Sequence, residues 1–398
     1  MKRILVSSLL LVCVLVSLNA GDFGLDISNT TLYTYTDTWN VMQSNRALLW
    51  VSLPLAESVR LYISGYYDFY GVFSDALTEI NPARLDVGVS YVAFKPQLER
   101  LLFTVKAGRL QTADTVNSIY SGYFDGLTLT LATGNSKVDA ATGYLGLLYK
   151  KEAMILIDED DRAGYTDDTV YFTEPRMLAM VAYSVDDLLQ EFDIGFEFWS
   201  QFDFAPNGIA THSLYYEPRA KWRIGPYFAL SGFGILSMYI TDQIQLGYAY
   251  GGEFSARIPS SLLRTTVSCR LYTSGGTTGD FISYAPIRLS SVALYAGGIY
   301  GDATQISLKV SFAPLASMIF AVQGGILLRE GTMVPAGYAA NAQSKFIGSE
   351  YGAQLVWQVV SDFYFILGGG VFLPNILDAF PADAQPEWKA MLTCGLKI

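Results

Sequence analysis

Residues 191–224 show a clear alternation of apolar and polar side chains. Over 192–202 the even positions are mostly phenylalanine or isoleucine, while the odd positions include acids. Over 214–224 the even positions are again mostly apolar and the odd ones include bases. A period of two predicts two β-strands, each with one apolar and one polar face. A soluble sandwich would bury the apolar face, whereas a membrane barrel would turn it toward lipid and keep the charged face in a wet interior.

The rest of the chain distinguishes between these two folds. The composition is 51% hydrophobic, yet no stretch after residue 20 reaches the length of about 18 apolar residues that a spanning helix needs. Apolar strands that face lipid must close into a barrel, because an open edge would leave backbone groups unsatisfied in hydrocarbon. Alternating segments recur about eighteen times, with about sixteen as the alternative count.

Loop lengths add to this pattern. Connections after even-numbered segments are short, and those after odd-numbered segments are mostly longer, which is typical of membrane barrels. We therefore predict an all-β fold, a transmembrane antiparallel up-and-down β-barrel. One segment is expected at 140–151. Around 276–312 we expect a Gly/Thr-rich loop and one clear strand at 305–312, with 291–301 taken as loop or strand extension.

The N-terminus indicates secretion. Lys2 and Arg3 precede an apolar run at 4–18, and the small residue Ala20 follows it. This predicts a cleaved signal peptide over residues 1–20, because the run is too short for a convincing membrane span. No linker or low-complexity segment interrupts residues 21–398, so we expect a single barrel domain there.

Charge and cysteine content exclude some functions. The formal charge is −11, and removal of Lys2 and Arg3 makes it −13, which argues against nucleic acid as a partner. Cys269 and Cys394 fall on apolar strand faces many strands apart, so we expect free, buried thiols.

Charged side chains on the polar strand faces are candidates for pore lining. Antiparallel pairing across a loop centred near Asn207 places Asp193 beside Lys221, and Glu191 beside Arg223. Such charges would order water and select polar solutes; alternatively, they form cross-strand ion pairs that hold the strand register. The pore-lining candidates are Glu191, Asp193, Glu197, Arg219, Lys221, Arg223, Arg60, Arg264 and Arg270.

Four short motifs resemble porin-type outer-membrane barrels of diderm bacteria. Residues 106–110 read KAGRL and 124–127 read FDGL, similar to a porin strand end and the return strand of its constriction loop. Residues 348–352, GSEYG, and 368–374, GGGVFLP, resemble the C-terminal hairpin of alginate-export and OprD-like porins. The final residue, Ile398, departs from the aromatic residue common at the end of such barrels.

The resemblance implies that residues 111–123 fold into the lumen and bring Arg109, Asp114 and Asp125 near a constriction. An ordinary extracellular loop is the alternative. Arg109 shares its position parity with the apolar Phe103 and Val105, which would turn it toward lipid unless a bulge at Gly108 redirects it.

Little in the sequence indicates catalysis. The acidic loop at 158–174 has enough carboxylates for a divalent cation, but a solvated surface loop is the favoured interpretation. The one histidine, His212, is adjacent to Ser213, and neighbouring strand residues point to opposite faces, so they form no nucleophile–base pair. We expect no enzyme activity, cofactor or metal.

Together these observations predict an outer-membrane channel for the passive diffusion of small polar solutes, since a barrel of about eighteen strands encloses an aqueous passage unless loops plug it. Its expected partners are outer-membrane lipid, small polar solutes and the outer-membrane assembly machinery. The signal peptide would carry it across the inner membrane. The alternatives are a surface-exposed barrel for adhesion or antigen display, and a hydrophobic-ligand transporter with a plugged lumen.

Overall fold

The computed structural model describes residues 21–35, 38–74, 78–153, 157, 159–167, 169–204, 210–259, 263–276, 303–329, 344–376, 380 and 383–398. The expected signal peptide and the uncertain segment 291–301 lie outside these residues.

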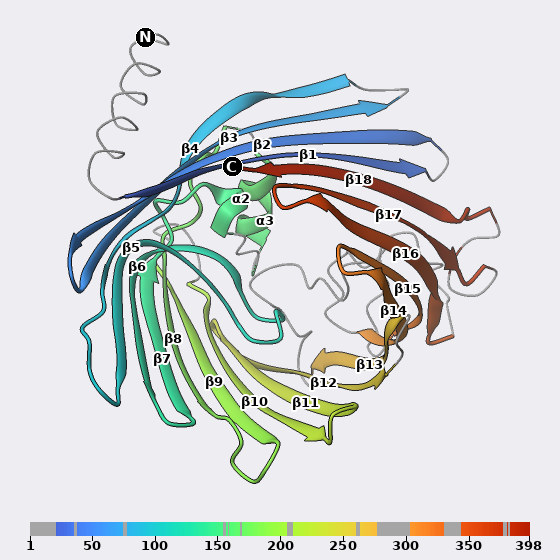
Figure 1. The fold of residues 1–398 in the computed structure, drawn as a ribbon. Coiled ribbons are helices and arrows are strands. Elements are labelled where there is room, and N and C mark those ends of the chain that lie inside the picture. The colour runs from blue at the N-terminus through green and yellow to red at the C-terminus, as the bar shows by residue number, and fades with distance from the viewer. Residues whose placement is uncertain are drawn as a thin grey trace.

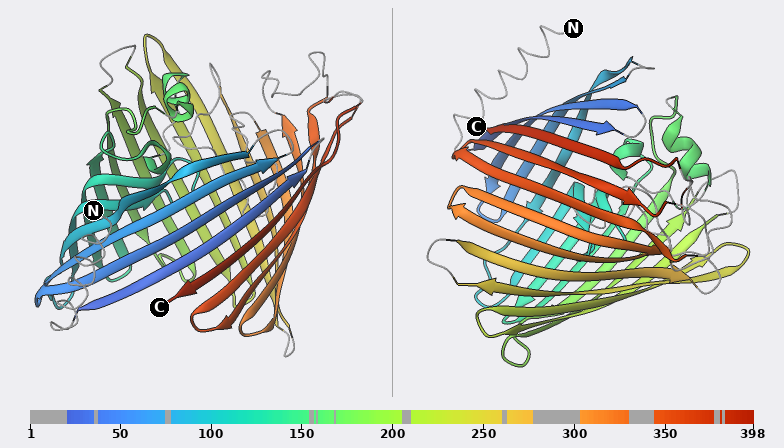
Figure 2. Two further views of the ribbon diagram at one scale, coloured as in Figure 1. Left: turned by 90° about the horizontal axis from the view of Figure 1, so that it is seen from above. Right: turned by 90° about the vertical axis from the view of Figure 1, so that its right-hand side faces the viewer.

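Eighteen strands form one closed antiparallel barrel (Figure 1), as the alternation predicts. The strands are β1 (Asp22–Tyr35), β2 (Trp39–Ala56), β3 (Val59–Ser74), β4 (Thr78–Phe94), β5 (Leu102–Ala113), β6 (Ser121–Thr133), β7 (Ser136–Tyr144), β8 (Arg176–Val185), β9 (Phe192–Asp203), β10 (His212–Ile224), β11 (Phe228–Ile240), β12 (Ile244–Ile258), β13 (Arg264–Gly276), β14 (Ala303–Leu315), β15 (Met318–Arg329), β16 (Phe346–Val360), β17 (Phe363–Pro374) and β18 (Glu387–Lys397). Figure 2 shows the strands from two further directions.

The barrel closes where β1 meets β18. Their register runs from the pair Asp26–Lys397 to the pair Tyr35–Trp388. The backbone N–H groups of Leu25 and Ile398 each donate to the other residue's carbonyl oxygen at 2.8 Å. Closure pairs the strands that would otherwise form two open edges of the sheet.

The side chains are arranged inside-out relative to a soluble sandwich. In β9, Phe196, Phe198 and Phe202 are 41%, 43% and 42% exposed, whereas Trp199 and Gln201 are fully buried. The apolar face of the alternating hairpin therefore lies on the outside of the barrel and the polar face lies within it, as expected for a transmembrane barrel.

Two short helices, α2 (Lys150–Ala153) and α3 (Glu159–Thr166), lie in the connection between β7 and β8. Figure 1 shows them within the outline of the ring of strands, and Figure 2 shows α3 close to one end of the barrel. Among the residues that the structure describes, no helix is long and apolar enough to cross a membrane.

Some strand boundaries differ from the sequence prediction. The strand expected at 140–151 is β7, which ends at Tyr144 and is followed by α2. Strands β3 and β4 extend so far that only residues 75–77 lie between them, and the β11–β12 connection is 241–243. The sequence predicts a longer loop through residues 81–82, which is wrong because pairing of β3 with β4 continues beyond the alternating apolar positions. The short β11–β12 connection agrees with the segment ends expected at 240 and 243. The long connections whose residues are mostly described in the structure include 114–120 and 145–175.

The cysteine prediction is half right. Both Cys269 and Cys394 are free, as expected. Their expected burial is wrong, because Cys269 is exposed and Cys394 is partly exposed. The apolar face of a barrel strand points outward, so a cysteine on that face of β13 faces the membrane and not a protein core.

Candidate functional site in the barrel interior

The β5–β6 hairpin leaves the barrel wall halfway along its length. Strand β4 begins at Thr78, but its pairing with β5 runs only from Ser90–Arg109 to Phe94–Val105. The β5–β6 pairing continues beyond that point, to Ala113–Ser121. The outer part of the hairpin therefore separates from β4, and Figure 1 shows it bending into the ring of strands.

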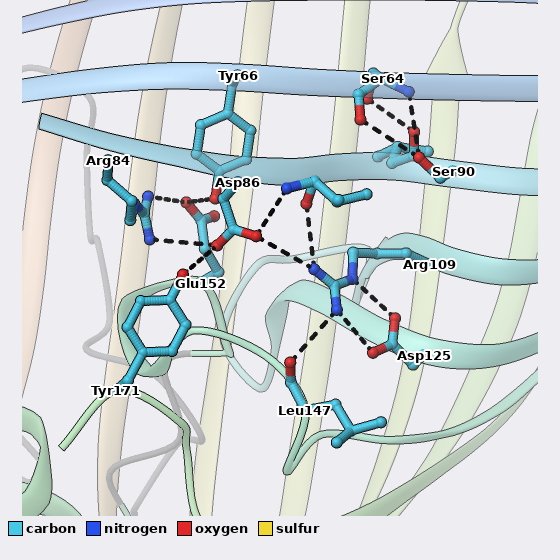
Figure 3. Close-up of polar contacts among 12 residues, drawn as sticks. Ser64, Tyr66, Arg84, Asp86, Ser90, Arg109, Asp125, Leu147, Glu152 and Tyr171 are labelled. Carbon is cyan, nitrogen blue, oxygen red and sulfur yellow. Dashed lines mark hydrogen bonds and ion pairs between the residues drawn. The ribbon is translucent and has the colours of Figure 1, made fainter. Parts of the chain in front are cut away.

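Gly108 marks the point of departure. Its φ of 138° lies in the region that only glycine adopts easily. The next residue, Arg109, points into the polar network of Figure 3. Strict alternation along β5 predicts that Arg109 faces lipid. This prediction is wrong, because Gly108 interrupts the regular strand geometry.

The connection 114–120 is folded around one carboxylate. Asp114 is 1% exposed and accepts the backbone N–H groups of Ser118, Ile119 and Tyr120 at 2.7–2.9 Å. Burial raises the pKa of the Asp114 carboxyl, and the nearby Glu197 carboxylate adds to this, although the three hydrogen bonds act in the opposite direction.

This connection is attached to the wall formed by β9 and β10. The Thr115 hydroxyl donates to the Glu197 carboxylate, and the Tyr120 ring lies 6.0 Å from the Trp199 ring. Arg219 pairs with the same Glu197. Asp114, Thr115, Glu197 and Arg219 form the first polar cluster of the interior.

Replacement of Asp114 by alanine tests whether this carboxylate holds the connection in place. The variant leaves three buried N–H groups without their acceptor, at a cost of about 1–3 kcal/mol for each group. We expect proteolytic cleavage within 114–120 and a noisier single-channel current. The Asp114→Asn variant, which keeps an oxygen facing Ile119 and Tyr120, should show a smaller change. Equal protease resistance in wild type and Asp114→Ala would contradict this role.

A second polar cluster lies between β3, β4, β5, β6 and α2 (Figure 3). Arg84 Nη2 lies 2.8 Å from an Asp68 oxygen and 3.0 Å from a Glu152 oxygen. Arg109 binds both oxygens of Asp125, at 2.8 and 2.9 Å, the two-pronged geometry that makes strong arginine–carboxylate pairs.

Further groups complete this second cluster. Arg109 Nη1 lies 3.8 Å from Asp86 Oδ1. The Tyr66 hydroxyl donates to Glu152 at 3.0 Å, and the Tyr171 hydroxyl donates to Asp86 at 2.9 Å. The cluster therefore connects the barrel wall to the β5–β6 hairpin and to the β7–β8 connection.

The proposed constriction residues divide between these two clusters. Arg109 and Asp125 are paired with each other, whereas Asp114 lies beneath the connection on the β9–β10 side. Sequence reasoning did not select Arg84, Asp86 or Glu152. The alternation places Arg84 and Asp86 on the polar face of β4, so they could have been found, but Glu152 lies on a helix where no helix was predicted.

The β9–β10 hairpin has the expected register but different ion pairs. Asp193 is the register partner of Lys221, and the Arg223 N–H donates to the Glu191 carbonyl at 2.8 Å. The salt bridge, however, joins Arg223 to Asp193, at 2.8 Å. The Glu191 carboxylate instead accepts the Gly225 N–H at 3.0 Å. Glu191 has a φ of 70° and lies in the turn before β9, outside the regular strand.

Of the remaining arginine candidates, Arg60 and Arg264 lie near the short turns and Arg270 lies in the middle of β13. Arg60 lines an inner cavity of about 1380 Å³, whose walls come from 54–60, 93–106 and 130–134. Arg264 lines a second cavity of about 540 Å³. Arg270 is the register partner of Glu253.

The acidic loop differs from its sequence interpretation. Asp161 of α3 is 2% exposed and lies 2.8 Å from Arg176, which in turn lies 3.7 Å from Asp203. The prediction of a solvated loop is therefore wrong for Asp161. Asp167 is exposed, and its hydrogen bonds from Thr169 lower the pKa of its carboxyl. Among the described side chains, no group of three or more His, Cys, Asp or Glu residues is placed to hold a metal ion.

The histidine and its neighbouring serine serve structural contacts. His212 Nδ1 accepts the backbone N–H of Asp203 at 3.1 Å, and the Ser213 hydroxyl donates to Gln201 at 3.1 Å. Each residue is therefore engaged with a different partner in β9.

A closed barrel with a polar interior, an apolar exterior and an inward-folded hairpin defines a transmembrane β-barrel with the porin fold. Comparison with solved structures agrees with the resemblance to OprD-like porins. The structure of OpdQ from Pseudomonas aeruginosa matches with a TM-score of 0.61 and 8% identity, over 96% of this chain and 99% of that chain.

Two other Pseudomonas aeruginosa structures are similar. OccK2 (OpdF) has a TM-score of 0.61 and 13% identity, over 95% of this chain and 98% of that chain. The outer-membrane protein opdK has a TM-score of 0.59 and 12% identity, over 95% and 99%. The TM-scores and the coverage establish a shared fold, and at these low identities they establish nothing beyond the fold. No family model and no curated protein matches the sequence.

Proposed function

We propose that the protein is an outer-membrane channel through which small polar solutes diffuse. The observation that carries this proposal is the ionic lining of the barrel interior, where charged side chains from the wall meet the inward-folded hairpin. Such a lining suits water and polar solutes and would be costly against an apolar ligand. The similar fold of opdK, an outer-membrane protein, supports the location.

The proposal also covers how the protein reaches the outer membrane and which residues line its passage. Residues 1–20 direct the chain across the inner membrane, and the outer-membrane assembly machinery inserts residues 21–398 into the lipid. Glu197, Arg219, Arg109 and Asp125 belong to the narrowest part of the passage. Asp193, Lys221, Arg223, Arg60, Arg264 and Arg270 line its wider parts, whereas Glu191 lies at a turn.

Single-channel recording of the folded protein in a planar bilayer tests this function. Discrete, stable current steps in KCl are the expected result. A plugged lumen is the second candidate, because α2 and α3 lie across the opening of the barrel in the view along its axis. A folded barrel that passes no current would refute the open channel and favour the plugged transporter.

The interior charges predict a preference for cations. The acidic side chains of the two clusters are Asp68, Asp86, Asp114, Asp125, Glu152 and Glu197, and the basic ones are Arg46, Arg84, Arg109 and Arg219. Acids outnumber bases, so the passage should attract cations. In a KCl gradient the reversal potential should indicate cation preference. The preference should weaken on acidification, since a carboxyl with a raised pKa, such as Asp114, loses its charge at a higher pH than an ordinary aspartate.

A charge-neutralised variant sharpens this measurement. Asp86→Asn combined with Glu152→Gln should shift the reversal potential toward anions, because the arginines of the second cluster then dominate the local field. Asp242→Asn, in the exposed β11–β12 turn, is the matched control and should leave the potential unchanged. Equal shifts in both variants would contradict a selective interior.

A further inference from the structure

Three aromatic side chains form a continuous surface inside the barrel, apart from the two charged clusters. The first is Trp50 of β2, whose register partner in β1 is Gly24. A methyl group added to Gly24 would lie 2.6 Å from each of three indole atoms, Cε2, Cζ2 and Nε1. The indole therefore lies over the glycine and occupies the space into which a side chain at position 24 would project.

Tyr62 of β3 and Tyr91 of β4 extend this surface. Their rings are nearly parallel: Trp50 and Tyr62 lie 6.0 Å apart at 18°, and Tyr62 and Tyr91 lie 5.4 Å apart at 18°. Tyr62 and Tyr91 are direct register partners. Lys106 of β5 holds its ammonium 4.8 Å from the Tyr91 ring centre, a cation–π contact.

The aromatic surface faces the interior. Ile63, the residue after Tyr62, is 49% exposed on the outer face, while Ser64 is buried. Lys106 also lines the inner cavity of about 1380 Å³. The surface of Trp50, Tyr62 and Tyr91 therefore lies between that cavity and the charged cluster of Figure 3, where a solute moving along the passage would meet it.

We propose that this aromatic surface is a binding site for ring-shaped sugars. A sugar ring presents C–H groups on one face and hydroxyl groups around its edge. The C–H face fits against the apolar faces of Trp50 and Tyr62, which would otherwise remain hydrated. The sugar hydroxyls accept hydrogen bonds from the Lys106 ammonium and exchange them with the phenol groups of the two tyrosines.

This proposal deepens the proposed channel function by naming a class of solute. A charged cluster alone would favour any small ion, whereas an aromatic surface with polar groups at its rim selects a solute that is both flat and hydroxylated. The site needs no net charge on the solute, since the ammonium of Lys106 against the Tyr91 ring can donate hydrogen bonds to neutral hydroxyl groups.

The test is blockage of the KCl current by maltotriose added to the bilayer chamber. Transient closures whose frequency rises with sugar concentration are expected. Trp50→Ala and Tyr62→Ala should each weaken the apparent affinity at least tenfold, and Trp50→Phe should retain most of it. Gly24→Ala keeps all three aromatic rings but displaces the indole, so it should resemble Trp50→Ala. Trp222→Ala, on the outer face of β10, is the matched control.

Conduction of KCl and binding of sugar are separate readouts. A conducting channel that maltotriose does not block would overturn the sugar site and leave the channel function intact. Equal blockage by the open-chain polyol sorbitol, or blockage by the planar aromatic nicotinamide but not by maltotriose, would also overturn it. If the barrel passes no current, quenching of tryptophan fluorescence by maltotriose in the detergent-folded protein, lost in Tyr62→Ala, which keeps the reporting Trp50, decides the question independently.

Discussion

Replacement of Arg176 by methionine is expected to destabilise the protein by about 3–5 kcal/mol, because removal of one partner leaves buried charges uncompensated. Arg176 begins β8, and its side chain is 2% exposed. It lies between Asp161 of α3 and Asp203 at the end of β9, at 2.8 and 3.7 Å. At such low exposure, solvent cannot replace the guanidinium.

The same substitution should also change conduction. Asp161 additionally accepts the Ile157 N–H at 2.8 Å, so the ion pair fixes the start of α3. The end of α3 is held separately by the buried Lys150, whose ammonium donates to the Gly164 and Asp167 carbonyl oxygens. Loss of Arg176 frees one end of the helix inside the barrel, and we expect larger and more variable current steps.

Urea unfolding in lipid vesicles, together with bilayer recording, measures both effects. The control is the triple variant Arg176→Met, Asp161→Asn, Asp203→Asn, which removes all three charges and keeps oxygen acceptors for the backbone. Its stability should return close to that of wild type, since a fully neutral cluster contains no buried charge without a partner. A triple variant as unstable as Arg176→Met would show that packing, and not charge, dominates here.

Replacement of Gly108 by alanine should prevent the barrel from reaching its folded form in good yield. An alanine Cβ would lie 2.2 Å from the Ser90 carbonyl oxygen and 2.9 Å from the Tyr91 Cα. Both are backbone atoms of β4, so relief requires separation of β4 from β5. The φ of 138° adds a strain of about 1–3 kcal/mol for a residue with a side chain.

Electrophoretic mobility before and after heating distinguishes the folded barrel from the unfolded chain. We expect little of the folded band for Gly108→Ala. The matched control is Gly134→Ala in the β6–β7 turn, where φ is 54° but no atom lies within 4 Å of the added methyl. It should lose only a little stability. Equal losses in the two variants would attribute the effect to φ and not to contact with β4.

The barrel itself could be predicted from the sequence, because strand alternation depends on neighbouring residues alone. The pattern around Phe196 and Glu197 requires one apolar face. The signal-like N-terminus, together with the absence of long apolar runs, indicates that this face meets lipid. The strand count and the register of Asp193 with Lys221 followed from the same local rule.

The interior could be predicted only in part, because distant residues determine it. The inward course of the β5–β6 hairpin depends on contacts such as Thr115 with Glu197, which lie 82 positions apart. Glu152 joins the cluster around Arg84 through a helix of one turn, too short to leave a periodic signal. The buried pair of Arg176 and Asp161 resembles two surface residues in sequence, since charge alone does not reveal burial.

The seam between β1 and β18 bears on how freely the chain could be rearranged. Its hydrogen bonds are the same antiparallel pairs that join every other neighbour, and Leu25 and Ile398 lie in direct contact. A short linker could therefore join residues 21 and 398, and new termini could be opened at an exposed turn such as 316–317 between β14 and β15. Such a circular permutant would retain all eighteen strand pairings in a different order of synthesis. The architecture thus depends on which strands are neighbours, and not on which strand comes first.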